Sequence, residues 1–373
     1  MRILLLHNRY RSEGGEERVV ADLRSLLAAR GHTVALIERR SDGVGRAAAA
    51  RALVSGGASP EEIGDAVRAL RADVVHAHNL HPLFGWRALA AARAAGARTV
   101  LHLHNFKLFC AIGVAYRDGA PCFRCRGSNT LPGLRFNCRG SLGEASSYAV
   151  GLHRQQPHLF EHADRLVAVS AATLRRLIEL GLPAQRTATL ANFVAAPDFA
   201  AASAAGVGEY ALISGRLVEE KGFDTAVTAA RAAAVPLVVA GEGPDEGRLR
   251  RLAAGGEVRF TGWISRQALA DLRARAAVVL VPSRSEEACP YSALDALAAG
   301  VPVLASDRGG LPELVGPAHV LPAGEAAPWS TALAALFRDP SARERAGAAA
   351  LARARERFSE DAYYARLIEI YGG

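Results

Sequence analysis

The feature that most constrains this chain is a repeated alternation between short apolar runs and helix-like stretches. The runs carry four or five apolar residues in succession, which is typical of strands buried on both faces of a parallel sheet. They are ILLLH, DVVHAH, TVLHLH, RLVAVS, YALISG, PLVVAG, VVLVPS and PVLASD. Between them, stretches such as EERVVADLRSLLAARG have an apolar spacing near 3.6 residues. This alternation predicts a doubly wound α/β fold.

The alternation is interrupted once, at residues 193–210, a stretch of small residues that we interpret as a linker. It separates an N-terminal Rossmann-like domain at 1–195 from a C-terminal one at 208–350. Residues 351–373 are predicted to end in an amphipathic helix that packs back on the N-terminal domain. Ligands of parallel sheets bind at the carboxyl ends of the strands. We therefore expect a ligand cleft lined by strand-to-helix loops of both domains.

Composition excludes some classes of protein. The 373 residues are 50% hydrophobic and 6% aromatic, as expected for a globular protein. No apolar run reaches the roughly 18 residues that cross a bilayer, and the N-terminus lacks a signal-peptide pattern, so we expect a cytoplasmic protein. The net charge of +8 suits an acidic substrate or an anionic membrane surface without specifying either. Only Lys107 and Lys221 are lysines, which suggests positions that favour a compact point charge.

The first candidate loop is Gly14–Gly15, which directly precedes a predicted helix. Glycine allows backbone N–H groups to approach an anion closely, and a helix start favours negative charge. Glu13, Glu16 and Glu17 crowd the same loop. Because acidic residues also stabilise helix starts, a plain turn is an equal alternative.

The second candidate loop is SGRLVEEKGFD. Arg216 ends a predicted strand, and Lys221 opens the following helix five residues later. Two cations at one strand end can bind a diphosphate from two directions. The alternative is a solvated turn in which Glu219 and Glu220 pair with these cations.

The third candidate loop is SRSEEACPYSALDALAAGVPV. Glu287 and Asp295 are eight residues apart, so their carboxylates could accept hydrogen bonds from the hydroxyls of one ligand. Tyr291 and Ser292 lie at the predicted helix start, where their N–H groups could meet a phosphate. Taken alone, the two acids could equally be helix caps.

These motifs together resemble the retaining GT-B glycosyltransferases of the large family-four type, the glycosyl transferases group 1. GRLVEEKG is similar to the diphosphate-binding motif of that family, and EACPYSALDALAAGVPV to its Glu-x7-Glu motif. GGEERVV, LHLHNF and VRFTGWIS resemble its glycine loop, its His-bearing strand end and the segment that flanks the base. The resemblance covers almost the whole chain in the expected order. It implies two Rossmann-like domains facing each other across a cleft.

The resemblance also implies catalytic roles for four residues. Arg216 and Lys221 would neutralise the donor diphosphate and the charge that develops on it. Glu287 would hold hydroxyls of the transferred sugar. His104 would lie beside the reacting sugar.

Further donor contacts are carried over in the same way. Backbone groups of Gly15, Tyr291 and Ser292 would contact phosphate, and Asp295 would hold the ribose hydroxyls. Two positions depart from the family pattern. Asp295 stands where Glu is usual, and Pro290 removes one N–H from the loop.

The activity implied is retaining transfer of a hexosyl-type sugar from a nucleotide-diphosphate sugar to a hydroxyl acceptor. The acceptor could be a glycan, a lipid-linked saccharide or a small metabolite. No Asp-x-Asp motif is present, so the cations would replace a divalent metal and no cofactor is expected for catalysis. Peripheral contact with the inner face of an anionic membrane is a further expectation.

Three other functions were weighed against this one. A nucleotide-sugar epimerase of the same architecture would form product without an acceptor. A nucleic-acid-binding protein would use arginines and a cysteine module, but basic and aromatic residues are only faintly interleaved, and no nucleic acid is expected. An oxidoreductase would use Gly241, Gly243 and Gly247, whose spacing is one residue too long for a dinucleotide fingerprint.

Four cysteines form a separate motif within a glycine-rich insertion at 105–140. Cys110, Cys122, Cys125 and Cys138 lie within 29 residues, and the central pair is a Cys-x-x-Cys. This pattern fits a structural zinc site in a reducing compartment, with free thiols or a disulfide as the alternatives. Cys289 is interpreted as a small packed residue.

Overall fold

The computed structural model describes residues 1–9 and 14–372; Glu13 of the glycine loop lies outside them. The chain divides into two compact units. The first consists of residues 1–115, 122–191 and 364–373, and the second of residues 116–121 and 192–363.

The first unit is built on a six-stranded parallel sheet. Its strand order is β2-β1-β3-β4-β7-β8. The strands are β1 (Arg2–Arg9), β2 (Thr33–Arg40), β3 (Val74–Ala77), β4 (Arg98–Leu103), β7 (Arg165–Ala168) and β8 (Thr187–Thr189). Positions 3–8 of β1 are all buried, as the unbroken apolar run predicts.

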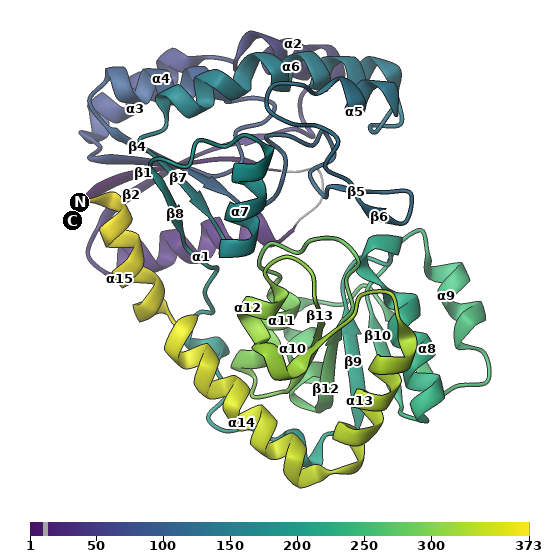
Figure 1. Cartoon of the computed structure of the whole chain (residues 1–373). Helices are drawn as coiled ribbons and strands as arrows, with labels where there is room; N and C mark the ends of the chain where they lie inside the picture. The colour runs from purple at the N-terminus through teal and green to yellow at the C-terminus, as the bar shows by residue number, and fades with distance from the viewer. Residues whose placement is uncertain (10–13, 373) are drawn as a thin grey trace. The chain divides into compact units, whose positions relative to one another are not determined.

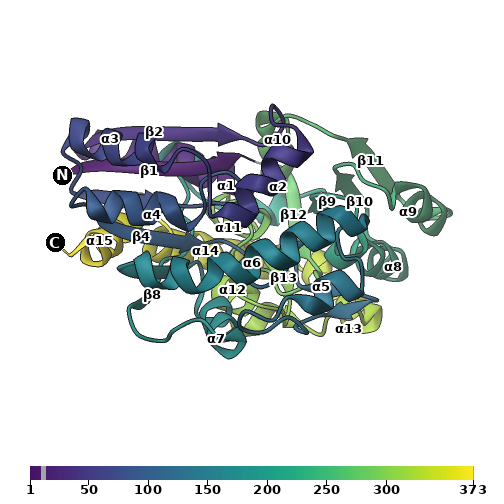
Figure 2. The ribbon, with the colours of Figure 1, turned by 90° about the horizontal axis from the view of Figure 1, so that it is seen from above.

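Helices cover both faces of this sheet. In Figure 1, α2, α3, α4 and α6 lie over one face and α1 and α7 over the other, and Figure 2 shows the first set from above. The helices are α1 (Gly15–Ala29), α2 (Arg46–Ser55), α3 (Pro60–Leu70), α4 (Gly85–Ala94), α6 (Leu142–His162) and α7 (Ala171–Leu180). The last ten residues, most of them in α15 (Glu360–Tyr371), also belong to this unit.

The cysteine-bearing insertion has little regular structure. Its elements are the two-residue strands β5 (Tyr116–Arg117) and β6 (Ala120–Pro121) and the five-residue helix α5 (Leu131–Arg135).

The second unit repeats the architecture of the first. Its parallel sheet has the order β11-β10-β9-β12-β13-β14. The strands are β9 (Tyr210–Ser214), β10 (Leu237–Ala240), β11 (Val258–Gly262), β12 (Ala276–Val281), β13 (Val303–Ser306) and β14 (Val320–Leu321). Two parallel sheets of six strands confirm the doubly wound α/β fold predicted from the sequence.

The helices of the second unit also form two layers. Helices α8 and α13 pack on each other over one face, whereas α11 packs against α12 and α14 over the other. The helices are α8 (Phe223–Ala233), α9 (Glu246–Ala253), α10 (Arg266–Ala274), α11 (Tyr291–Ala298), α12 (Leu311–Val315), α13 (Ala326–Arg338) and α14 (Pro340–Arg357). The fully buried Trp329 of α13 anchors the first of these layers, and its ring N–H donates to the Pro322 carbonyl at 2.8 Å.

The stretch interpreted as a linker is packed against the second unit. Phe193 and Val194 are completely buried. The Asn192 side chain donates to the Cys289 carbonyl at 3.0 Å, and the Val194 N–H donates to the Phe358 carbonyl at 2.9 Å. Among the helices of the described chain, none is both long and apolar enough to span a bilayer.

The packing of Trp329 predicts a large loss of stability on truncation. Trp329→Ala should lower the free energy of unfolding of the second unit by about 3–5 kcal/mol, because a filled core position becomes a cavity. Trp263, whose side chain is 72% exposed, is the matched control: Trp263→Ala should change it by less than about 0.5 kcal/mol. Urea denaturation of both variants measures this, and equal losses would contradict the assignment of Trp329 to the core.

Candidate active site

The clearest polar constellation of the second unit joins two strand-to-helix loops. Lys221, in the loop after β9, places its Nζ 2.5 Å from Oε1 of Glu287, in the loop after β12. The hydroxyl of Ser283 donates to the same oxygen at 2.7 Å. Both loops follow the carboxyl ends of central parallel strands, where α/β proteins bind ligands.

Glycines allow these loops to approach one another closely. Gly222 has φ +68°, and a Cβ there would lie 2.1 Å from the Pro282 carbonyl oxygen. Gly309 has φ +56°, and a Cβ there would lie 2.2 Å from the Glu287 carbonyl oxygen. Gly310 then donates its N–H to that carbonyl at 2.7 Å. The loop after β13 thus packs against the backbone of Glu287 and hydrogen-bonds to it.

Two of the glycines considered for an oxidoreductase, Gly241 and Gly243, are likewise explained by close approach of the backbone. Gly241 has φ +136°, and a Cβ on it would lie 1.9 Å from the Gly215 carbonyl oxygen. A Cβ on Gly243 would lie 2.3 Å from the Leu217 carbonyl oxygen. Both residues therefore pack the β10 loop against the segment that carries Arg216, which accounts for them without a dinucleotide.

The electrostatics of this constellation keep Glu287 ionised. Burial by itself raises the pKa of Glu287, but Lys221, the Ser283 hydroxyl and Arg216 outweigh it, so the pKa lies below its ordinary value. The Arg216 side chain is 67% exposed and its Nη2 is 4.0 Å from Oε1 of Glu220. An exposed guanidinium and a half-buried ammonium thus flank one buried carboxylate.

The remaining predicted donor residues lie on α11. Tyr291 and Ser292 are its first two residues, and the first backbone donors back to Pro290 are Ala293 and Leu294. Asp295 lies inside the helix, where Oδ2 is 3.4 Å from Nη2 of Arg273. Its carboxylate is therefore already ion-paired, and its contact with a ribose stays a prediction.

The predicted glycine loop of the first unit begins α1. Gly14 has φ −147°, which any residue adopts, and among the described residues the nearest group to a Cβ there would be the Glu17 carboxylate, at 3.4 Å. Backbone strain does not demand glycine at this position. Close approach of a ligand remains a reason for it.

The glutamates in this loop make structural contacts. Glu17 accepts from the Gly14 N–H at 2.9 Å and lies 3.6 Å from Nε2 of His7. The Glu16 carboxylate accepts from the side-chain amide of Asn105, the neighbour of His104. Burial, with a smaller effect of Glu17, raises the pKa of Glu16 to about 8. The crowding of acids seen in the sequence thus attaches α1 to the strand end that carries His104.

His104 follows β4 directly and belongs to a buried histidine cluster. Its Nε2 is 2.9 Å from Nδ1 of His78, so one of these two nitrogens donates a proton and the other accepts it. Burial lowers the pKa of His104 well below its ordinary value, and nearby histidines lower it further. His104 is therefore a neutral imidazole at physiological pH.

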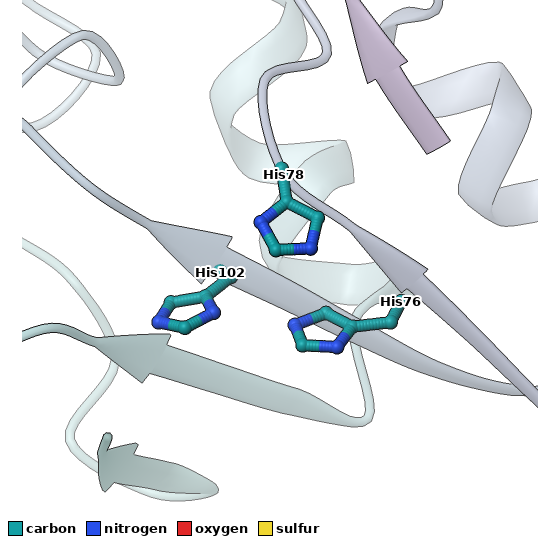
Figure 3. A group of neighbouring side chains, drawn as sticks. All are labelled: His76, His78 and His102. Carbon is teal, nitrogen blue, oxygen red and sulfur yellow. The ribbon is translucent and has the colours of Figure 1, made fainter. Parts of the chain in front are cut away.

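Three members of this cluster also have the composition of a metal site. Ring nitrogens of His76, His78 and His102 lie within 4.8 Å of one another, and all three side chains are buried (Figure 3). However, the rings of His76 and His102 are stacked at 13° and those of His76 and His78 at 24°. Because a tetrahedral ion requires ring planes that converge on it, we interpret the group as a stack of neutral imidazoles.

A cavity of about 440 Å³ lies in the first unit. Arg46, Lys107 and Arg139 line it together with Glu144, and alanines of α2 form its apolar wall. Burial, followed by the nearby Arg139, lowers the pKa of Lys107 to about 7. The cavity can therefore hold a ligand with polar or anionic groups.

Comparison with known proteins decides the family. Residues 13–196 match the family described as Glycosyltransferase Family 4, and residues 198–353 match the one described as Glycosyl transferases group 1. The chain belongs to this glycosyltransferase family. The resemblance identified from the motifs is thereby confirmed.

Relatives of known activity include mannosyltransferases. The chain is 30% identical over 277 residues to a GDP-mannose-dependent alpha-mannosyltransferase of Mycobacterium tuberculosis, covering 70% of this chain and 63% of that protein. It is 41% identical over 107 residues to a GDP-mannose-dependent alpha-(1-6)-phosphatidylinositol dimannoside mannosyltransferase of the same species, covering 27% and 28% of the two chains. The chain thus matches less than two thirds of the length of these relatives.

Solved structures share the fold of this glycosyltransferase family member. Sucrose-phosphate synthase from Thermosynechococcus elongatus superposes with a TM-score of 0.73 at 18% identity, over 100% of this chain and 98% of that one. Anabaena HepE in complex with UDP gives 0.69 at 18% identity, over 100% of both chains.

Several residues of the site were missed by sequence reasoning. Ser283 contacts Glu287 from four residues earlier in the same loop, so the local sequence offered a signal for it. Arg273 contacts Asp295 from another helix, and no local pattern links these two partners. His78 had a signal, because DVVHAH and TVLHLH both end in His-x-His. Adjacent parallel strands with the same ending place those histidines side by side.

The Lys221–Glu287 pair predicts energetic coupling. Lys221→Met should destabilise the second unit by about 3 kcal/mol, because it leaves a buried carboxylate without its cation. Adding Glu287→Gln should recover most of that loss. A double-mutant cycle from urea denaturation measures the coupling, and additive losses would contradict it.

The Lys221–Glu287 pair also makes the free energy of unfolding of the second unit depend on pH. Because the folded pKa of Glu287 lies below 4.5, its stabilising contribution is present above that pH and is lost as the pH falls through the folded pKa. The difference in unfolding free energy between wild type and Glu287→Gln should therefore shrink below about pH 4.5. If the difference in unfolding free energy between the two proteins stayed constant down to about pH 3, the ion pair would not be the source of the pH dependence.

Proposed function

We propose that this chain transfers a sugar, with retention of anomeric configuration, from a nucleotide-diphosphate sugar to a hydroxyl acceptor. The observation that supports this most directly is the Lys221–Glu287 contact, with Arg216 exposed beside it, in a member of a glycosyltransferase family. It offers an acceptor of hydroxyl hydrogen bonds and two donors to phosphate within one small area.

The second unit would hold the donor. Arg216 and Lys221 would bind the diphosphate, and the N–H groups of Tyr291 and Ser292 at the start of α11 would point at it. Lys221 would then bridge the diphosphate and Glu287, which keeps the carboxylate ionised and able to accept from sugar hydroxyls. In the first unit, the Gly15 amide would approach a phosphate.

The chemistry follows from where charge develops. When the bond between the anomeric carbon and the diphosphate oxygen breaks, negative charge grows on the diphosphate, and the two cations stabilise it. The acceptor hydroxyl would attack from the face that the diphosphate leaves, and a phosphate oxygen would take its proton. The cations supply the charge compensation, so no divalent metal is included in the mechanism.

His104 would act on the sugar as a hydrogen-bonding group. Its imidazole is neutral, and the hydrogen bond to His78 orients it, so it contributes no charge to the reacting centre. His78 would be a positioning residue.

GDP-mannose is the donor that we propose to test first, because relatives of this chain are named as GDP-mannose-dependent enzymes. The acceptor would bind in the cavity of the first unit, where Arg46, Lys107 and Arg139 favour a phosphate-bearing, lipid-linked acceptor. Such an acceptor would be met by peripheral contact with the cytoplasmic face of an anionic membrane.

Removal of either donor cation should reduce transfer strongly. Arg216→Ala and Lys221→Ala should each lower kcat by about 10²–10³, because each removes a charge that acts mainly in the transition state. Arg250→Ala on α9 is a matched control, since that arginine is similarly exposed and forms its ion pair with Glu246 of the same helix, at 2.8 Å. Release of the nucleoside diphosphate from a panel of nucleotide sugars measures the rates.

Product analysis separates this proposal from the epimerase alternative. A transferase requires an acceptor for the glycoside product, and NMR of the product should show retained anomeric configuration. Unchanged rates in both variants, or an isomerised sugar formed without acceptor, would contradict the proposal.

The cavity of the first unit predicts a separable effect on the acceptor. Ala50→Phe, which fills part of the cavity from α2, should raise the acceptor KM by about tenfold or more while leaving nucleotide binding unchanged. Ala48→Phe is the control on the same helix, because Ala48 is exposed and does not line the cavity. Equal effects of both substitutions would argue against acceptor binding there.

A further inference from the structure

We propose that Cys110, Cys122, Cys125 and Cys138 bind one zinc ion through four thiolates and thereby fix the segment that follows His104. The proposal concerns the first unit alone and does not depend on the donor site. The backbone already gathers the four cysteines, which come from three different parts of the insertion.

One residue, Ala115, joins the first pair. Its carbonyl accepts from the Cys122 N–H at 2.7 Å. Its own N–H is hydrogen-bonded to the Cys110 sulfur, as are those of Ile112 and Gly113. Backbone N–H groups directed at a sulfur stabilise the thiolate that a metal ion binds.

Gly133 joins the second pair in the same way. Its carbonyl accepts from the Cys138 N–H at 3.0 Å. Its own N–H is hydrogen-bonded to the Cys125 sulfur. A Cβ on Gly133 would lie 4.0 Å from Sγ of Cys125, which places this sulfur beside the glycine.

Two links bring the pairs together. Cys122 and Cys125 belong to one Cys-x-x-Cys turn, the spacing that lets two sulfurs bind the same ion. A Cβ on Gly133 would lie 3.8 Å from the Cβ of Ala111, the residue after Cys110. The Arg139 guanidinium, next to Cys138, donates to the Ala111 carbonyl at 3.4 Å. The backbone segments that carry the four cysteines therefore lie beside one another, although in the described part of the chain no three of their sulfurs lie within 4.8 Å of one another.

The electrostatics of the segment favour a thiolate complex. A thiol that coordinates zinc is deprotonated, so a site of four cysteines carries four thiolates. Residues 105–140 contain five arginines and one lysine against one aspartate, which offsets the charge of −2 on a four-thiolate zinc complex.

Zinc also explains the fold of this segment better than the alternatives. None of the four cysteines forms a disulfide, and each is only partly buried. A disulfide would use two sulfurs and require an oxidant, whereas zinc uses all four: each S–H releases its proton to solvent and forms one Zn–S bond, without a change of oxidation state. A single tetrahedral ion is a closed, structural site.

The consequence lies next to His104. The Cys110 N–H donates to the Phe106 carbonyl at 2.8 Å, and the Phe106 N–H donates to the Gly113 carbonyl at 3.1 Å. Phe106 is 2% exposed within the main core of the first unit. Fixing Cys110 therefore fixes the turn that begins two residues after His104 and carries Lys107 of the cavity wall.

Elemental analysis of the untagged protein, purified without chelators, tests the proposal. We expect one zinc per chain, and none in Cys122→Ser/Cys125→Ser. Cys289→Ala, which removes the buried cysteine of the second unit, should keep its zinc. Zinc absent from the wild type, or retained in the double variant, would overturn the assignment.

Thiol titration of the wild type covers the case in which the double variant does not fold. The thiols are modified stepwise with an organic mercurial, and a metal indicator measures the zinc that is released. One zinc should be released as four thiols react. Substitution with cobalt should give the absorption bands of a tetrahedral thiolate complex. Four thiols that react without release of zinc, or an intact mass showing a disulfide, would refute the site.

Discussion

The arrangement of the loops after β9 and β12 depends on one ion pair, between Lys221 and Glu287. The two residues are 66 positions apart, and each stands in the loop that follows a central strand of the same sheet. A buried carboxylate is costly unless it is paired and hydrogen-bonded. Lys221 and Ser283 meet both needs, and a phosphate ligand would approach the same ammonium. The pair therefore links the stability of the loops to the charge that the proposed chemistry requires.

Close backbone approach makes that pair possible. Gly222, Gly241 and Gly309 each adopt positive φ values where a Cβ would collide with a neighbouring carbonyl. In the first unit, Gly14 has a negative φ, and the start of α1 is attached through Glu16 and Asn105 to the strand end of His104. Glycines with positive φ thus pack the loops of the second unit together.

The sequence predicted the strands and loops better than the contacts between their side chains. Short apolar runs located the strands, since burial on both faces favours apolar residues. The loops after β9 and β12 carry Lys221 and Glu287, as expected from the positions of these runs. What could not be predicted were partners supplied by distant elements. Arg273 approaches Asp295 from α10, and Asn105 donates to Glu16 from 89 residues away. Nothing in the sequence links either pair, because tertiary packing alone brings the partners together. The histidine stack could be predicted in part. The repeated His-x-His is visible in the sequence, but the stacking of the rings depends on which strands are neighbours in the sheet.

The central claim is that the cations of the second unit recognise a diphosphate. Calorimetric titration of the wild type and of Lys221→Ala with a nucleoside, its monophosphate and its diphosphate, in the guanosine and uridine series, tests it most directly. The account predicts that affinity rises with each phosphate in the wild type and that this rise is largely lost in the variant. Equal binding of nucleoside and diphosphate, or the same rise in both proteins, would contradict the account.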